Sequence, residues 1–189
     1  MSTRRDQFGL TLIELIFFIV IVGGALAGVL SVLNVTTKSS ADPLVRKTML
    51  AIAQALLEEV QLLPFTYCDP DDANALTATS AVVGGLGCST AVEGAGPEAG
   101  ETRSTGLALF DNVSDYHGLT LNPITDVTGN IAPAAGYSAT FSVSNEAGFG
   151  PAGLTLPSAA VLRIAVTVTK GSDSFTLEGY RTRYAPNMF

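Results

Sequence analysis

The position of Glu14 suggests a specific chemistry more strongly than that of any other residue in the chain. Glu14 is the single charged residue in an apolar run that begins at Leu10 and continues to about Leu33. A short basic leader that ends at Gly9 precedes this run. An acid at membrane depth costs about 2.5–3.5 kcal/mol on insertion scales, so it is a functional hypothesis by default. Glu14 either pairs with a cation or lies at the membrane interface, where its carboxylate reaches water.

The stretch from Gly9 to Glu14 resembles the processing site of type IV prepilins. The family pattern is a glycine, usually a phenylalanine, and then Thr-Leu-Ile-Glu, which residues 11–14 match; Leu10 stands in place of the phenylalanine. The resemblance implies that a prepilin peptidase cuts after Gly9 and leaves Leu10 as a methylated N-terminus. It also implies that, in a fibre, Glu14 pairs with the Leu10 ammonium of a neighbouring subunit. The apolar run follows the cleavage site, unlike that of a secretory signal peptide, so the mature chain would keep it.

A second set of side chains with recognisable chemistry is the group Asp69, Asp71 and Asp72. Calcium is a hard cation that takes several oxygen ligands, and closely spaced carboxylates supply them. The group lacks the glycine and the distal glutamate of an EF-hand loop. An acidic turn rich in proline and asparagine is the simpler interpretation. The three aspartates are therefore a weak candidate calcium site, and we expect no cofactor.

Nothing in the sequence suggests catalysis. His117 is the only histidine, and no serine or cysteine has an evident base partner. There is no phosphate loop, dinucleotide fingerprint or zinc spacing. The net charge is −7 and no basic stripe is present, which argues against a nucleic-acid partner. We expect a protein that is neither an enzyme nor a nucleic-acid binder, with His117 in a surface turn.

Cys68 and Cys88 are the two cysteines of the chain, and both follow the apolar run. In an exported segment an even number of cysteines favours a disulfide. The alternative is two reduced, buried thiols. We predict the disulfide, which would close a short glycine-rich loop and stabilise the fold by about 3 kcal/mol.

The elements that must position these residues begin with a long N-terminal helix. Residues 1–9 form the leader, and residues 10–33 exceed the roughly 20 residues that a membrane span needs. A polar break over residues 34–43 ends in Asp42-Pro43, where we expect the helix to kink or to restart with an N-cap. Residues 44–63 then resume helical periodicity. The apolar face of this second part comprises Val45, Met49, Ile52, Ala53, Leu56, Val60 and Leu63.

The remaining residues, 64–189, have the composition of a globular head, and 189 residues are enough for one such domain plus an anchor. Residues 68–103 are predicted to be a long loop, since they are rich in Gly, Ala, Ser and Thr. Alternating patterns predict strands at residues 137–143, 161–169 and 174–184, the last two joined as a hairpin. The expected fold class is α+β, with the spine helix packed on an antiparallel sheet. The prepilin resemblance implies the same pilin-like layout.

A narrower resemblance concerns residues 56–60 and 64–74, which are similar to the minor prepilin of the mannose-sensitive haemagglutinin (MSHA) pilus, the MshD-like family. It implies a minor structural subunit that crosses the bacterial inner membrane once, with its head in the periplasm. Its partners would be membrane lipid, the prepilin peptidase, other pilin subunits and the pilus assembly machinery, and its final place an extracellular pilus. Two alternatives remain, a type II secretion pseudopilin and a membrane-anchored periplasmic binding module.

Overall fold

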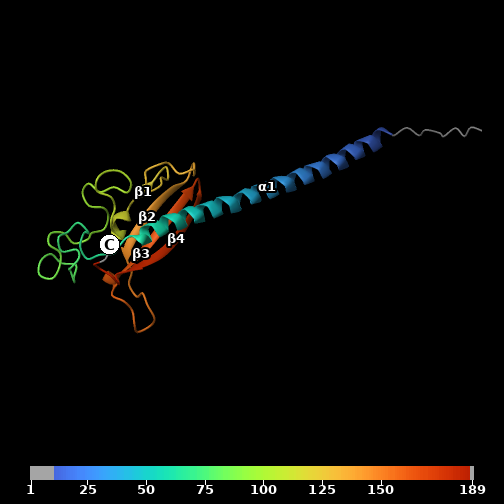
Figure 1. Cartoon of the computed structure of the whole chain (residues 1–189). Helices are drawn as coiled ribbons and strands as arrows, with labels where there is room; N and C mark the ends of the chain where they lie inside the picture. The colour runs from blue at the N-terminus through green and yellow to red at the C-terminus, as the bar shows by residue number, and fades with distance from the viewer. Residues whose placement is uncertain (1–10, 188–189) are drawn as a thin grey trace, which may run out of the picture. The chain divides into compact units, whose positions relative to one another are not determined.

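The chain begins with one long helix, α1, which spans Leu12–Leu62 (Figure 1). The computed structural model describes residues 11–187, apart from the side chains of residues 34–42. The chain divides into two compact units, Met1–Val45 and Arg46–Phe189. The apolar run and the amphipathic run of the sequence are thus consecutive parts of one helix.

Of the two outcomes expected at Asp42-Pro43, a kink or a restart, the restart does not occur: α1 continues through Pro43. Asp42 lies inside the helix rather than at an N-cap. A proline in a helix removes one backbone hydrogen bond and costs about 3 kcal/mol. A break would instead leave up to four N–H groups and four carbonyl groups without helical partners. Continuity is therefore the smaller loss at Pro43.

The first part of α1, Leu12–Leu33, is long and apolar enough to cross a membrane, judged by length and composition. None of its side chains is buried within the protein. Thr11 caps the start of the helix, since its Oγ1 accepts a hydrogen bond from the Glu14 N–H at 3.4 Å. A threonine followed three residues later by a glutamate is a common helix-start signal. The Thr-Leu-Ile-Glu sequence therefore also has a local role in beginning α1.

The second part of α1 buries the predicted apolar face. Met49, Ala53, Leu56 and Val60 are each at most 5% exposed. Val45, Ile52 and Leu63 are half-buried on the same side. The 3.6-residue period of these positions predicted the buried stripe.

An antiparallel sheet of four strands forms the centre of the second unit (Figure 1). The strands lie in the order β1-β2-β3-β4, so that neighbours in sequence are also neighbours in the sheet. The predicted strands at residues 137–143, 161–169 and 174–184 are confirmed as β2, β3 and β4, and only the two-residue β1 was not predicted. The bounds are Thr120–Leu121 (β1), Ser138–Asn145 (β2), Val161–Lys170 (β3) and Asp173–Thr182 (β4).

One face of the sheet carries the apolar rows, and the end of α1 lies against it. Phe141, Val166 and Leu177 form one such row across β2, β3 and β4. Gly179 of β4 marks a close approach, because a Cβ there would lie 2.5 Å from Gln61 Nε2 and 3.1 Å from the Leu57 methyl groups. A glycine at this position permits the helix to pack directly on the strand.

Between α1 and β1 the chain is mostly irregular. Residues 68–103 contain no helix and no named strand, only isolated bridges such as Cys68 with Val92. The short 3₁₀ helix η1, Val113–Tyr116, lies directly before His117, and a second one, η2, spans Ser158–Ala160 between β2 and β3. This irregular region supplies most of the polar side chains that meet in the head.

Candidate functional site

The predicted processing residues Gly9 and Leu10 lie outside the described residues. Glu14 is described and is exposed, in the first turn of α1. Its apolar neighbours are exposed on every side of the helix, from Leu12 at 77% to Phe18 at 65%. A helix that is hydrophobic all round is stable only in lipid or among other apolar surfaces. Glu14 is thus the single carboxylate in the part of α1, Leu12–Leu33, that needs an apolar environment.

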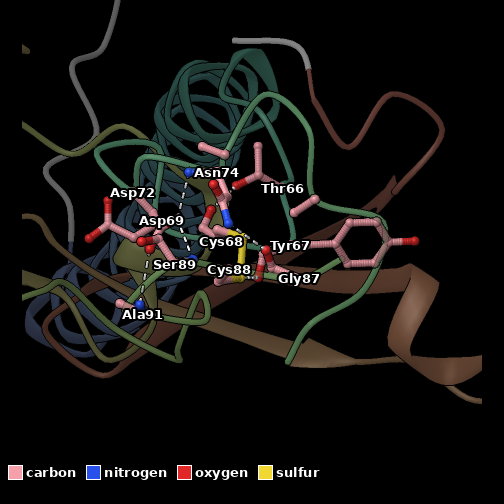
Figure 2. Close-up of a disulfide and its surroundings, with 12 residues drawn as sticks. Thr66, Tyr67, Cys68, Asp69, Asp72, Asn74, Gly87, Cys88, Ser89 and Ala91 are labelled. Atoms are coloured by element: carbon pink, nitrogen blue, oxygen red, sulfur yellow. Dashed lines mark hydrogen bonds between the residues drawn. A yellow bond between two sulfur atoms is a disulfide. The ribbon is translucent and has the colours of Figure 1, made fainter. Parts of the chain in front are cut away.

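The predicted disulfide is present and joins Cys68 to Cys88 (Figure 2). Both cysteines are fully buried, and they form a small core with Ala75 and Ala78. Next to the disulfide the N–H of Glu93 donates to the Tyr67 carbonyl at 3.1 Å. The cross-link therefore holds the segment after α1 beside the segment that carries Glu93.

Asp72 organises the loop that the disulfide closes, as Figure 2 shows. One of its oxygens accepts hydrogen bonds from the backbone N–H groups of Asn74 and Ser89, each at 2.8 Å. The other accepts from the N–H groups of Thr90 at 2.7 Å and Ala91 at 3.1 Å. Burial alone would raise the pKa of Asp72, but these donors prevail and hold that pKa well below its usual range. Asp72 is a structural carboxylate that is fully occupied by donors.

The three aspartates of the sequence-predicted calcium site do not converge on one point. Asp72 is occupied by the loop, and the side chain of Asp71 is exposed. The Asp71 N–H donates to Asp69 Oδ1 at 2.7 Å, which makes this stretch an acidic turn. Of the three, only Asp69 lies among other carboxylates, namely those of Glu101 and Asp111.

A cluster of six carboxylates lies beside the disulfide region. We call Glu93, Glu98 and Asp115 the inner triad, in which one carboxylate oxygen of each lies within 4.8 Å of the other two. We call Asp69, Glu101 and Asp111 the outer triad, which has the same spacing. The two triads are linked, since the N–H of Glu98 donates to Glu101 Oε2 at 3.3 Å.

The inner triad contains carboxylate oxygens that are buried without hydrogen-bond partners. Asp115 is 0% exposed, and its Oδ1 has no partner. Both oxygens of Glu93 and Oε2 of Glu98 are likewise buried and unpartnered. Among the described residues, no ion pair joins a member of either triad to a lysine or arginine. A buried, unpaired charge is expensive, so this group needs neutralisation from another source.

Asp115 is held in place by its other oxygen. Asp115 Oδ2 accepts from the N–H groups of Asp111 at 3.0 Å and Asn112 at 2.7 Å, which completes a capping box at the start of η1. The Asn112 side chain donates to Thr66 Oγ1 at 2.7 Å, and Thr66 Oγ1 donates to the Cys68 carbonyl at 2.6 Å. The carboxylate is therefore pre-positioned by a buried network that ends at the disulfide.

Burial and the nearby negative charges raise the pKa values of four of these carboxylates. Burial, and next the charge of Asp115, raise the pKa of Glu93 to about 9, of Glu101 to about 8 and of Asp111 to about 7. Burial also raises the pKa of Asp115 to about 6, against the lowering effect of the Asn112 and Asp111 N–H groups. Two ways of relieving this repulsion exist in principle, protonation and a bound cation.

A separate polar centre fastens α1 to the loops. The Arg103 guanidinium donates to both oxygens of Glu59 on α1, at 2.6 and 2.7 Å, and the Tyr116 hydroxyl donates to Glu59 at 2.6 Å. Arg103 also donates to the carbonyls of Thr125 at 3.0 Å and Asp126 at 3.1 Å. The Arg103 side chain is 4% exposed, so this ion pair is buried and structural.

A cavity of about 340 Å³ lies next to the inner triad. Its lining includes Glu93, His117 and Arg183. The Arg183 guanidinium stacks over the Phe65 ring at 3.8 Å, and His117 Nδ1 accepts the Val143 N–H at 3.2 Å. His117 is exposed, as expected for a histidine in a surface turn, and the bond to β2 gives it a structural role.

Comparisons with protein-family models, with curated proteins and with solved structures find no match for this chain. Its function must therefore be argued from its own residues.

Proposed function

We propose that this protein is a minor pilin-like subunit of a type IV pilus, made as a membrane-anchored precursor. The observation that carries the proposal is the helical stretch Leu12–Leu33, which is exposed and apolar on all sides and has Glu14 as its one charged residue. Such a surface is stable in lipid and equally stable against similar helices. A subunit that moves from a bilayer into a fibre core needs both properties.

In this proposal a prepilin peptidase cuts after Gly9, and Leu10 becomes the N-terminal residue. Glu14 then pairs with the Leu10 ammonium of a neighbouring subunit. Pairing offsets part of the cost of burying both charges and sets the axial register between subunits, since a displaced subunit would leave two buried charges unpaired. The cap from Thr11 keeps the first turn of the helix intact beside that contact.

The narrower form of the proposal is a subunit of an MSHA-type pilus, supported by the similarity of residues 56–60 and 64–74 to that family. The precursor would cross the bacterial inner membrane once, with its head in the periplasm, and would then become part of an extracellular fibre. A type II secretion pseudopilin shares the leader and the helix, and is the alternative within the same class.

The test is the substitution Glu14→Gln, with Glu58→Gln as a matched control that removes one exposed carboxylate elsewhere on α1. We expect the Glu14→Gln variant to be inserted in the membrane and cleaved to a Leu10 N-terminus, as mass spectrometry would show. Its amount in sheared fibres should be at least tenfold lower than that of the wild type. Glu58→Gln should enter fibres like the wild type. Equal incorporation of both variants, or recovery of intact chains that begin at Met1, would contradict the proposal.

A second candidate function is a membrane-anchored binding module. The observation that favours it is the cavity of about 340 Å³ lined by Glu93 and Arg183, which has the size of a small-ligand site. A module of this kind would keep its leader and would tolerate Glu14→Gln, because a neutral residue suits a bilayer better than an acid.

A further inference from the structure

We propose that the inner triad, Glu93, Glu98 and Asp115, is a calcium site, with the outer triad beside it as additional negative charge. The first argument is convergence. The three carboxylates come from two stretches of chain, yet one oxygen of each lies within 4.8 Å of the others. Without a positive charge among them, three carboxylates at this spacing repel one another.

The second argument is the state of Asp115. This side chain is 0% exposed, and its Oδ1 accepts no hydrogen bond, while its Oδ2 is held by two backbone N–H groups. A buried carboxylate oxygen without a donor is rare in native proteins and calls for a specific explanation. The capping network positions the Asp115 carboxylate, one oxygen of which lies within 4.8 Å of an oxygen of Glu93 and of Glu98. Both Glu93 oxygens and Glu98 Oε2 are also buried without hydrogen-bond partners. Four such oxygens in one place form a ligand set rather than isolated defects.

Among the described residues, no lysine or arginine forms an ion pair with the inner triad. Arg183 is the basic residue on the same cavity as Glu93, but its guanidinium stacks on the rings of Phe65 and Tyr67 and makes no ion pair with Glu93 among the described contacts.

The chemistry of the ligands selects the cation. Every candidate ligand is an oxygen, the cysteines are tied in the disulfide, and the one histidine bonds to the backbone of β2. Metals such as Zn²⁺ and Cu²⁺ prefer nitrogen and sulfur ligands, whereas Ca²⁺ takes six to eight oxygens in adaptable geometry. Glu93 and Glu98 lie on an irregular segment, which suits the adaptable shell of Ca²⁺ better than the strict octahedron of Mg²⁺.

A bound calcium ion would tie the loop segment 93–98 to η1 and, through Asn112 and Thr66, to the disulfide. The site is built from loops, so we expect an affinity in the range of extracellular calcium modules, with a Kd of about 10⁻⁴–10⁻³ M. The ion would then order the least regular part of the head where calcium is abundant. This inference does not depend on the chain being a fibre subunit.

The test is calorimetric titration of the full-length protein in detergent with CaCl₂ at pH 8, together with thermal unfolding. The informative variant is Glu93→Gln, because it keeps the size of the side chain and removes one of the three charges of the inner triad. The matched control is Glu178→Gln, which removes an exposed carboxylate on β4.

We expect saturable calcium binding by the wild type and by Glu178→Gln, and binding at least tenfold weaker in Glu93→Gln. At a 100-fold excess over Kd, calcium should raise the wild-type Tm by about 5–10 °C, whereas the metal-free Tm of Glu93→Gln should equal or exceed that of the wild type. The proposal is overturned if calcium has no effect, if Glu93→Gln responds like the wild type, or if MgCl₂ at the same concentration produces the same shift.

Discussion

Asp72 and Asp115 are both buried aspartates in the irregular part of the head, yet their carboxylates have opposite surroundings. Asp72 accepts backbone donors on both oxygens, which lower its pKa. Asp115 has donors on one oxygen only and lies close to Glu93 and Glu98, and burial raises its pKa. The residue type is the same, so the number and direction of nearby N–H groups decide which carboxylate is structural and which is available to a ligand.

The first prediction concerns Asp72 and acid. Its pKa in the folded protein lies below that of the unfolded chain, which is about 3.9. The stabilisation from Asp72 is therefore fully present above that pH and is lost progressively as the pH falls below it. We expect Asp72→Asn to lower the free energy of unfolding at pH 7, because one of its atoms becomes an NH₂ group that faces N–H donors.

The measurement is denaturant unfolding of the wild type and Asp72→Asn at pH 7 and at successively lower pH. The difference between the two proteins should shrink below about pH 4. Asp71→Asn, which changes an exposed neighbour, serves as the control. A difference that stays constant with pH would show that the Asp72 carboxylate is not the group responsible.

At the scale of the elements, the attachment of α1 to the head uses two kinds of contact. One is the apolar stripe of Met49, Ala53 and Val60, supported by the close approach at Gly179. The other is the buried ion pair between Glu59 and Arg103. Helical periodicity predicts the stripe, but Glu59 looks like an ordinary polar helix residue, because its partner lies far along the chain in a loop.

The second prediction is that Glu59→Ala destabilises the protein by about 3–5 kcal/mol, because it leaves the Arg103 charge buried and uncompensated. Glu58→Ala, which removes an exposed carboxylate bonded only to Gln54 on the same helix, should change the stability by no more than about 0.5 kcal/mol. Chemical denaturation measures both.

A double variant, Glu59→Ala with Arg103→Met, sharpens the comparison. Removing both charges should restore much of the free energy of unfolding that Glu59→Ala loses, since replacing a buried ion pair by apolar residues often leaves the stability unchanged. If Glu59→Ala and Glu58→Ala lower the free energy of unfolding by the same small amount, the ion pair does not fasten α1 to the loops.

At the scale of the whole molecule, the regular and irregular parts of the head are stabilised differently. The strands β2, β3 and β4 rely on backbone pairing and apolar rows. Residues 68–103 rely on the disulfide and on side-chain bonds such as those of Asp72. Asn187 extends this support, since its side chain donates to the carbonyls of Ala75 at 2.9 Å and Ala78 at 3.0 Å.

The third prediction is that the double variant Cys68→Ser with Cys88→Ser lowers the free energy of unfolding by about 2–4 kcal/mol. The loss of structure should be confined to the loop rather than spread over the head. Hydrogen exchange should accelerate at the amides of residues 75–101 and change much less in β3 and β4. Reduction of the wild-type disulfide should reproduce the pattern. Equal acceleration across the sheet and the loop would show that the disulfide stabilises the head as a single cooperative unit.

The sequence by itself determined the features that depend on local periodicity, and also the disulfide, because the chain has only two cysteines. The apolar helix, its buried stripe and the β3–β4 hairpin follow from spacing along a few consecutive turns or strand residues, and two cysteines allow one pairing. Only the tertiary structure decided that α1 continues through Pro43, because continuity is a balance of hydrogen bonds over the whole helix.

The carboxylate cluster also depended on tertiary structure. Its members range from Asp69 to Asp115 and occupy turns, loops and the short helix η1, and no period along the sequence relates their side chains to one another. The one signal in the sequence was the density of acids after the second cysteine, at Glu93, Glu98 and Glu101. Direction and distance between these side chains are set by the disulfide and the η1 capping network, and such contacts between distant segments exist only once the chain has folded.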